Sequence, residues 1–345
     1  MTKFRKNEIM GAPSRRRLLK IGGAALLTTP FVSRAWASTT DINMLAWYGH
    51  AEPDVVAEYA AANNVRFVPK YYAGGDNMLA LIAQSPPGTY DIILSDAEFV
   101  QQLNLAGYIE PLEASDYPLD DMLHEDFKKF PGHWADGKLY SMMVRGGHLG
   151  VSYNKNSITE EEAQSYSCFW KPELEGKVGH FDWHLPNLGM MSLYNGNGGS
   201  LWDLDDAKWD AVRDTTLSLR KQAGGFFDYG GSFNGLKNGE MQAMCGIGDW
   251  ITAPLEKDGA PVASTIPKEG GIQFTESYSI GKDSPKADLA KNFIQYMLSP
   301  QGQVKSAQMA AYPGFCVTKG GRAALIKADP AEAKRSHQMS GMAND

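Results

Sequence analysis

Histidines and closely spaced acidic residues often carry catalysis or bind metal ions, and in this chain their spacing supports neither role. Among 7 histidines, only His180 and His184 stand four residues apart, and their surroundings, including Pro186, predict a strand followed by a loop rather than a metal-binding helix. The acidic pair Asp205-Asp206 lies at the start of an expected helix, where acids stabilise the helix dipole. We therefore expect no metal site, no cofactor and no enzymatic activity.

The sequence also lacks the motifs of common enzyme classes. It has no GxSxG nucleophile elbow, no phosphate-binding loop, no HExxH and no GxGxxG after a strand. Its 3 cysteines, Cys168, Cys245 and Cys316, have no zinc-ligand spacing. One disulfide with a free thiol would be compatible with an oxidising compartment. A chain of this size does not need one, and we expect these side chains to be buried small apolar groups.

Length and charge narrow the possible functions further. The 345 residues are enough for two domains. The formal net charge is −7, and because residues 1–37 hold eight basic side chains and one acidic one, the rest of the chain carries −14. Nucleic-acid binding needs a basic surface that displaces counterions, so we expect none here. An acidic domain instead attracts small cations.

The amino terminus has the features of an export signal. An arginine pair lies within Ser14 to Lys20, a short apolar stretch runs from Ile21 to Val32, and Ala35-Trp36-Ala37 supplies the small residues of a cleavage site. The arrangement is similar to a twin-arginine signal, with a general secretory signal as the alternative. Both predict that residues 1–37 are removed and that the remainder is a soluble periplasmic protein.

Strand and helix patterns alternate along the rest of the chain, which predicts an α/β fold with mainly parallel sheets. We expect strands at residues 42–47, 65–71, 90–95, 149–153, 177–181, 239–245, 262–266 and 274–280. The expected helices are at residues 54–62, 77–83, 99–106, 205–223 and 286–298. Ligands of such sheets bind beyond the carboxyl ends of the strands, which places Trp47 to His50 and Ser95 to Glu98 at a candidate site.

A series of short motifs, in a fixed order, connects this chain with a known family. The motifs are Tyr90 to Leu94, Leu105 to Leu112, Gly150 to Asn154, Trp170 to Val178, Asn238 to Glu240, Gly248 to Trp250, and Ile266 to Gly270 followed by Glu276. With them the chain resembles the periplasmic polyamine-binding proteins of ABC importers, the spermidine/putrescine type of solute-binding protein. The resemblance covers nearly all of residues 41–325.

The resemblance implies a two-lobed periplasmic-binding-protein fold (type II), in which each lobe is a mainly parallel sheet flanked by helices and crossing strands form a hinge. Lobe 1 would comprise residues 38–147 and 275–325, lobe 2 residues 148–274, and residues 326–345 a flexible tail. It further implies that the protein captures a small amine between the lobes and delivers it to an inner-membrane ABC permease. We expect it to act as a monomer.

A polyamine is a flexible apolar rod with ammonium groups, so its site needs aromatic faces along the methylenes and carboxylates at the charges. The resemblance and the strand-end rule together indicate the ligand-binding residues Trp47, Tyr48, Asp96, Arg145, Asp249, Trp250, Phe274, Glu276 and Tyr312. Several positions depart from the family. Its serine, acid and tyrosine after the first aromatic residue are replaced by Tyr48, Gly49 and His50. Asp96 stands where the family has a serine, Asp249 and Trp250 are in changed order, and the acid of the first loop in lobe 2 is not evident at residues 182–186.

Arg145 keeps a second class of ligand open. A guanidinium in a cleft suits a carboxylate or phosphonate, so an aminophosphonate or amino-acid-like zwitterion is the alternative to a polyamine. Arg145 could equally pair with a carboxylate of the protein. A secreted hydrolase or transferase on the same scaffold, or a ferric-ion binder that uses Tyr71-Tyr72, are weaker alternatives. The acidic charge and the retained Trp47, Glu276 and Tyr312 favour the polyamine.

Overall fold

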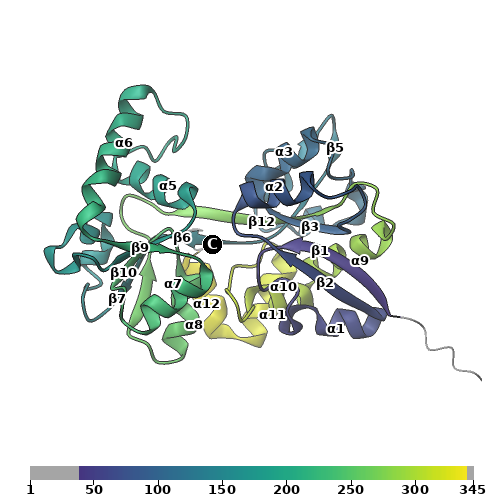
Figure 1. The fold of residues 1–345 in the computed structure, drawn as a ribbon. Coiled ribbons are helices and arrows are strands. Elements are labelled where there is room, and N and C mark those ends of the chain that lie inside the picture. Colours follow the sequence, from purple (N-terminus) through teal and green to yellow (C-terminus); the bar gives the residue numbers. More distant parts are fainter. Residues whose placement is uncertain (1–38, 340–345) are drawn as a thin grey trace, which may run out of the picture. The chain divides into compact units, whose positions relative to one another are not determined.

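The computed structural model describes residues 39–339, and all structural statements below refer to that part of the chain. The predicted export signal, residues 1–37, lies outside the described residues, as does the end of the expected tail, residues 340–345. Residues 39–339 form two five-stranded sheets and a two-stranded hairpin (Figure 1). No helix described there is long and apolar enough to cross a lipid bilayer.

The first sheet has the strand order β2-β1-β3-β12-β6. Strand β1 pairs in parallel with β2 and with β3, whereas β12 runs antiparallel to both β3 and β6. The strands are β1 (Thr40–Ala46), β2 (Val65–Tyr71), β3 (Ile92–Asp96), β6 (Met142–Leu149) and β12 (Ile272–Ile280). Every residue of β3 and β6 is buried, because helices and loops cover both faces of the sheet.

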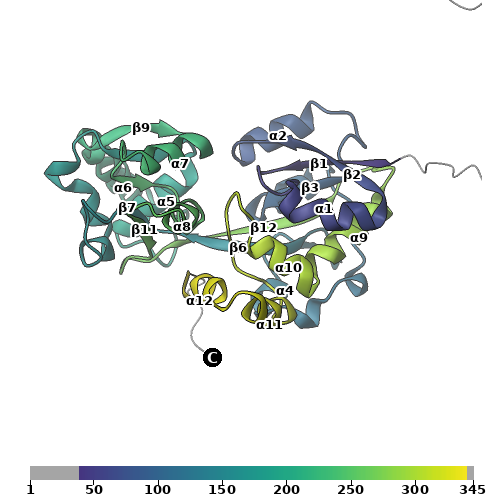
Figure 2. The same cartoon turned by 90° about the horizontal axis from the view of Figure 1, so that it is seen from below.

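Apolar side chains alternate between the two faces of this sheet. Ile42 and Met44 belong to the main core with α1 and α9, while Leu45 and Ile93 belong to a second core with α2 and α3. Figure 2 shows α2 and α1 on opposite sides of β1 and β3. The elements around this sheet are α1 (Pro53–Asn63), α2 (Gly75–Ala83), α3 (Val100–Leu105), α4 (Glu125–Lys128), β4 (Trp134–Ala135), β5 (Lys138–Leu139), α9 (Ala287–Leu298), α10 (Pro300–Ala307) and α11 (Lys319–Ala328).

The second sheet has the strand order β11-β7-β10-β8-β9. Strand β7 is antiparallel to both of its neighbours, and β10, β8 and β9 are parallel. The strands are β7 (Val151–Asn154), β8 (Val178–Phe181), β9 (Ala223–Phe227), β10 (Ala243–Cys245) and β11 (Val262–Thr265). The helices of this part are α5 (His184–Tyr194), α6 (Asp206–Ser218), α7 (Tyr229–Lys237) and α8 (Asp249–Lys257).

The α/β class is confirmed, but both sheets are mixed and not mainly parallel as expected. The reason lies in the two connections between the sheets. The chain leaves the first sheet through β6 into β7 and returns through β11 into β12, so the outgoing and returning strands run in opposite directions. Only Gly150 separates β6 from β7, and a Cβ there would lie 2.2 Å from the carbonyl oxygen of Thr265. A glycine is therefore required at this crossing.

The chain from residue 326 onward, which we expected to form a flexible tail, contains the end of α11 and the further helix α12 (Pro330–Met339). Ala333 of α12 packs in a small core with Ala307, Cys316 and Leu325. Arg335 of the same helix forms ion pairs with Glu332 and with Asp249. Because Asp249 is the first residue of α8, helix α12 contacts the part of the chain that carries the second sheet. We expected none of these contacts.

Candidate functional site

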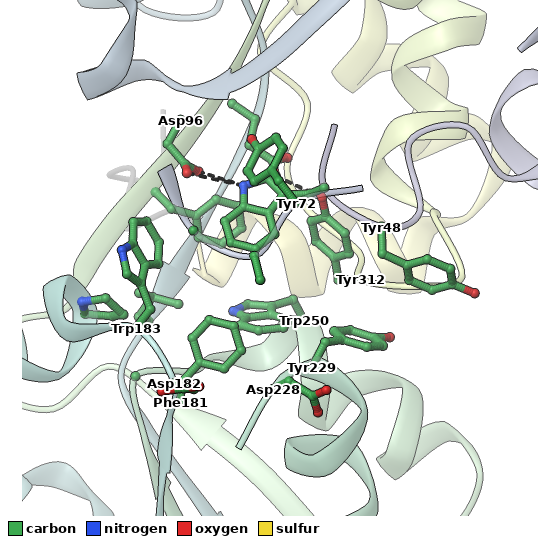
Figure 3. Close-up of a pocket in the computed structure, with 18 residues that line it drawn as sticks. Tyr48, Tyr72, Asp96, Phe181, Asp182, Trp183, Asp228, Tyr229, Trp250 and Tyr312 are labelled. Carbon is green, nitrogen blue, oxygen red and sulfur yellow. Dashed lines mark hydrogen bonds between the residues drawn. The ribbon is translucent and has the colours of Figure 1, made fainter. Parts of the chain in front are cut away.

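A cavity of about 260 Å³ lies at the ends of strands from both sheets (Figure 3). The first sheet contributes residues after β1 and β2 and the last residue of β3, as the strand-end rule requires. It also contributes residues from within the antiparallel strand β12. The second sheet contributes residues after β8 and β10 and the first turns of α7 and α8. The lining residues are Trp47, Tyr48, Tyr72, Ala73, Gly74, Asp96, Leu149, Phe181, Asp182, Trp183, Pro186, Asp228, Tyr229, Gly246, Trp250, Phe274, Glu276 and Tyr312.

Aromatic rings form most of the wall. The ring of Trp47 lies 4.8 Å from that of Tyr72 and 5.8 Å from that of Trp183, measured between centroids. On the other side, Trp250 stacks on Tyr229 at 6.1 Å and contacts Tyr312 edge-on at 5.9 Å. Rings at such distances present apolar faces with negative potential, which suit methylene chains and cations alike.

Asp96 is one of two buried acids that line this cavity, with 4% of its surface exposed. The indole Nε1 of Trp47 donates a hydrogen bond to its carboxylate, 3.2 Å from Oδ2 and 3.4 Å from Oδ1. No lysine, arginine or histidine pairs with this carboxylate within residues 39–339. Burial, and the negative charges of Glu98 and Glu276, raise the pKa of Asp96 well above its ordinary value. When this carboxyl group is ionised, no positive charge among the described residues pairs with it, so a cationic group of a ligand would stabilise the ionised form.

Glu276, the second buried acid, is already satisfied by the protein. Its Oε1 accepts a hydrogen bond from the hydroxyl of Tyr312 at 2.9 Å, and its Oε2 lies 3.1 Å from both His50 Nε2 and Arg145 Nε. Burial alone would raise the pKa of Glu276, but the charges and hydrogen bonds of these neighbours outweigh it and lower the pKa. Burial lowers the pKa of His50, so Arg145 is the permanent positive charge beside Glu276.

Arg145 does not line the cavity. Its side chain is fully buried, its Nη2 donates to the carbonyl oxygen of Tyr312 at 2.6 Å, and its guanidinium carbon lies 4.5 Å from the centre of the Tyr312 ring. Of the two roles considered for Arg145, the structure shows the pairing with a protein carboxylate.

Asp249 lies outside the cavity as well. It is buried at the start of α8 and forms an ion pair with Arg335, while its neighbour Trp250 lines the cavity. The other seven candidate residues, Trp47, Tyr48, Asp96, Trp250, Phe274, Glu276 and Tyr312, are brought together on the cavity wall.

Several lining residues were not among the candidates. Tyr72 follows β2, Trp183 and Asp182 follow β8, and Tyr229 follows β9 and begins α7. The strand-end rule that selected Trp47 applies equally to these positions and would have indicated them. We found no evident acid in the sequence of the first loop of lobe 2, residues 182–186. In the structure, Asp182 directly follows β8 and lines the cavity.

The weaker alternatives find little support in the geometry. The hydroxyl of Tyr71 donates to Glu52, and that of Tyr72 donates to the carbonyl oxygen of Leu94, so the two tyrosines do not converge as metal ligands. No group of three or more histidine, cysteine or acidic residues could hold a metal ion within the described chain. Cys168, Cys245 and Cys316 are buried free thiols, as the sequence suggested.

Comparison with known proteins places this geometry in a family. The model of the bacterial extracellular solute-binding proteins matches residues 54–334. The chain belongs to this family. It is thus a solute-binding protein, a non-enzymatic component of transport.

Individual relatives of this solute-binding protein are distant. The spermidine/putrescine-binding periplasmic protein 1 of Haemophilus influenzae is 23% identical over 285 residues, which are 81% of this chain and 77% of that protein. The solved spermidine/putrescine ABC transporter substrate-binding protein of Streptococcus pneumoniae superposes with a TM-score of 0.70 at 16% identity, covering 87% of this chain and 89% of that one. A binding protein of A. tumefaciens in complex with glucopine has the same TM-score, 0.70, at 17% identity, covering 87% and 92%. These structures share the fold.

Proposed function

We propose that this solute-binding protein captures a small polyamine in the cavity, with one ammonium group paired with Asp96. The observation that carries the proposal is a buried carboxylate without a cationic partner among the described residues, set in a wall of aromatic rings. An ammonium group would supply the missing charge. The aromatic faces of Trp47, Trp183 and Trp250 would contact the methylenes between the charges.

The charges at the opposite side of the cavity support a ligand with two cationic ends. Asp182 and Asp228 line the cavity from the loops after β8 and β9, and both are exposed. Figure 3 shows them on the side of the cavity away from Asp96. An acid at each end with aromatic rings between matches the shape of a diamine.

The zwitterionic alternative loses its main support. It rested on Arg145, whose guanidinium is buried behind Glu276 and does not line the cavity. No other arginine, lysine or histidine of residues 39–339 lines it either. A ligand carboxylate or phosphonate would therefore meet only acids and rings, which is unfavourable without a counter-charge.

Compartment and partner form part of the same proposal. The curated relatives are named as periplasmic binding proteins, and the first 37 residues have the features of an export signal. We expect the mature protein to work in the periplasm and to deliver its ligand to an inner-membrane permease.

Calorimetry on the purified mature protein tests the ligand class, with putrescine, spermidine, γ-aminobutyrate and an aminophosphonate as probes. The amines should bind and the zwitterions should not. Asp96→Asn keeps the shape and removes a charge-assisted bond, so amine affinity should fall by about 10- to 150-fold, or about 1.5–3 kcal/mol. Asp214→Asn, an exposed acid on α6, is the matched control and should leave affinity unchanged. Tight binding of a zwitterion with no binding of amines would refute the proposal.

A further inference from the structure

We propose that Tyr229 is the latch of the cavity, meaning a residue whose contact between the two parts of the chain must break before the cavity opens. A hydrogen bond from its side chain to the backbone of Ala311 joins the part with the second sheet to the part with the first, and it sets how long a ligand stays bound. The inference rests on the proposed function, because the latch closes the same cavity and its test uses putrescine.

The donor of this bond is oriented by the second-sheet part of the chain. Tyr229 is the first residue of α7, and the side chain of Asp228 caps this helix by accepting from the backbone N–H of Gly231 at 2.7 Å. The Tyr229 ring stacks on that of Trp250, with 6.1 Å between centroids and 16° between the ring planes. Both rings line the cavity. The Tyr229 side chain therefore moves together with α7 and α8.

The acceptor lies on a loop that is fixed to the first-sheet part. The Tyr229 hydroxyl donates to the carbonyl oxygen of Ala311, in the loop between α10 and α11. The backbone N–H of Ala310 donates to Asp54 of α1 at 2.8 Å. The loop also packs against Gly49, where a Cβ would lie 2.8 Å from the Cβ of Ala311. A carbonyl fixed in this way cannot follow Tyr229 when the two parts separate, so the bond breaks as the cavity opens.

Tyr48 adds ring contacts at the same side of the cavity. It follows β1, is 46% exposed, and its ring centroid lies 5.8 Å from that of Tyr229 and 5.4 Å from that of Tyr71. Figure 3 shows Tyr48 and Tyr229 on the side of the cavity away from Asp96. A ligand paired with Asp96 would thus be enclosed on this side by rings from both parts. The hydrogen bond of Tyr229 adds a directional link to these ring contacts.

The position of the bond determines its effect on binding. One hydrogen bond of this kind changes an equilibrium by about 2- to 10-fold. The bond forms only when the two parts are together, so its loss destabilises the closed cavity and leaves the open one unchanged. Capture of a ligand by the open cavity then keeps its rate, and escape from the closed cavity becomes faster.

Rapid filtration of the mature protein with radiolabelled putrescine measures both rates. Tyr229→Phe keeps the ring and removes the hydroxyl, so dissociation should become about 2- to 10-fold faster while the association rate is unchanged. Tyr194→Phe, an exposed tyrosine of α5 outside the cavity, is the matched control and should change neither rate. An unchanged dissociation rate in Tyr229→Phe, or a loss confined to association, would overturn the inference.

A measurement without ligand separates the latch from a direct ligand contact of Tyr229. Leu105→Cys on α3 and Leu217→Cys on α6 place spin labels at exposed positions, one on each part, and the 3 native cysteines are buried. Adding Tyr229→Phe should shift the distances between the labels toward longer values, because the two parts then separate more often. A hydroxyl that served only to contact the ligand would leave these distances unchanged, and that result would overturn the inference.

The two experiments also separate this inference from the proposed function. If putrescine does not bind to the wild type, the proposed function fails. The distances between the spin labels do not depend on any ligand, so they still decide whether Tyr229 acts as the latch.

Discussion

The indole Nε1 of Trp47 donates to the carboxylate of Asp96, 3.2 Å from Oδ2 and 3.4 Å from Oδ1. Trp47 directly follows β1 and Asp96 ends β3, and these two strands are parallel neighbours in the first sheet. One ring thereby contributes an apolar face to the cavity and also orients the acid. The two features that the proposed ligand would use, aromatic contact and negative charge, are therefore coupled at this pair.

Substitution of Trp47 separates these two contributions. Trp47→Phe keeps an aromatic face but removes the hydrogen bond to Asp96, so putrescine affinity should fall by about 1.5 kcal/mol, or roughly tenfold. Trp47→Ala removes the face as well and should cost more. Calorimetry measures both values. Equal affinities for the Phe and Ala variants would show that the ring itself contributes nothing to binding.

The raised pKa of Asp96 predicts that amine binding depends on pH. A ligand ammonium favours the ionised carboxyl group, so the pKa of Asp96 falls on binding and a proton is released between the bound and free values. The ligand amines stay protonated, because their pKa values are close to that of lysine, about 10. Affinity should therefore rise with pH until the free carboxyl group is fully ionised.

Calorimetry at one pH in two buffers of different ionisation enthalpy measures this proton release. Asp96→Asn should abolish the release. Proton uptake on binding, or the same release in the Asn variant, would exclude Asp96 as the titrating group.

The pair between Asp249 and Arg335 should stabilise the fold. Arg335→Met leaves Asp249 buried without a partner, and unfolding free energy should fall by about 2 kcal/mol. This value lies below that of a fully buried pair because 22% of the Arg335 side chain is exposed. Denaturant unfolding measures it. Adding Asp249→Asn should recover part of the loss, and an unchanged midpoint in the single variant would argue against the pair.

Gly314 packs against the side chain of Arg145, and its substitution tests how close this packing is. A methyl group at this position would meet Arg145 Nη2 at 2.6 Å and the carbonyl oxygen of Gly146 at 2.8 Å. Gly314→Ala should therefore destabilise the protein by about 1–3 kcal/mol through overpacking. Gly199→Ala is the matched control, since a Cβ there meets nothing within 4 Å. Similar thermal midpoints for the two variants would contradict the close packing around Arg145.

The strands could be predicted from the sequence better than the helices that surround the second sheet. Strand β2 has the expected bounds, and the strand-end rule placed Trp47 and Asp96 at the cavity. Helices α5, α7 and α8 were missed, and each contains a residue of low helix propensity: Pro186, the glycines of α7 and Pro254. Packing and caps compensate, as where the Asp228 side chain accepts from the backbone N–H of Gly231.

The roles of Arg145 and Asp249 could not be read from sequence for a different reason. Both depend on which distant residue stands opposite. Glu276 faces Arg145 because of the register between β12 and β6, and Arg335 reaches Asp249 only because α12 packs against α10 and α11. Local patterns specify which residues are apolar and where elements begin, but they do not specify the partner of a buried charge.

The concentration of tryptophan at the cavity has a practical consequence. Three of the 8 tryptophans, Trp47, Trp183 and Trp250, line it, and the Nε1 of Trp47 is bound to the carboxylate of Asp96. Indole emission responds to nearby water and charge, so a ligand that displaces water and places a cation beside Asp96 changes both. The unlabelled protein thus carries its own optical reporter, and binding of the proposed amine should change its intrinsic fluorescence.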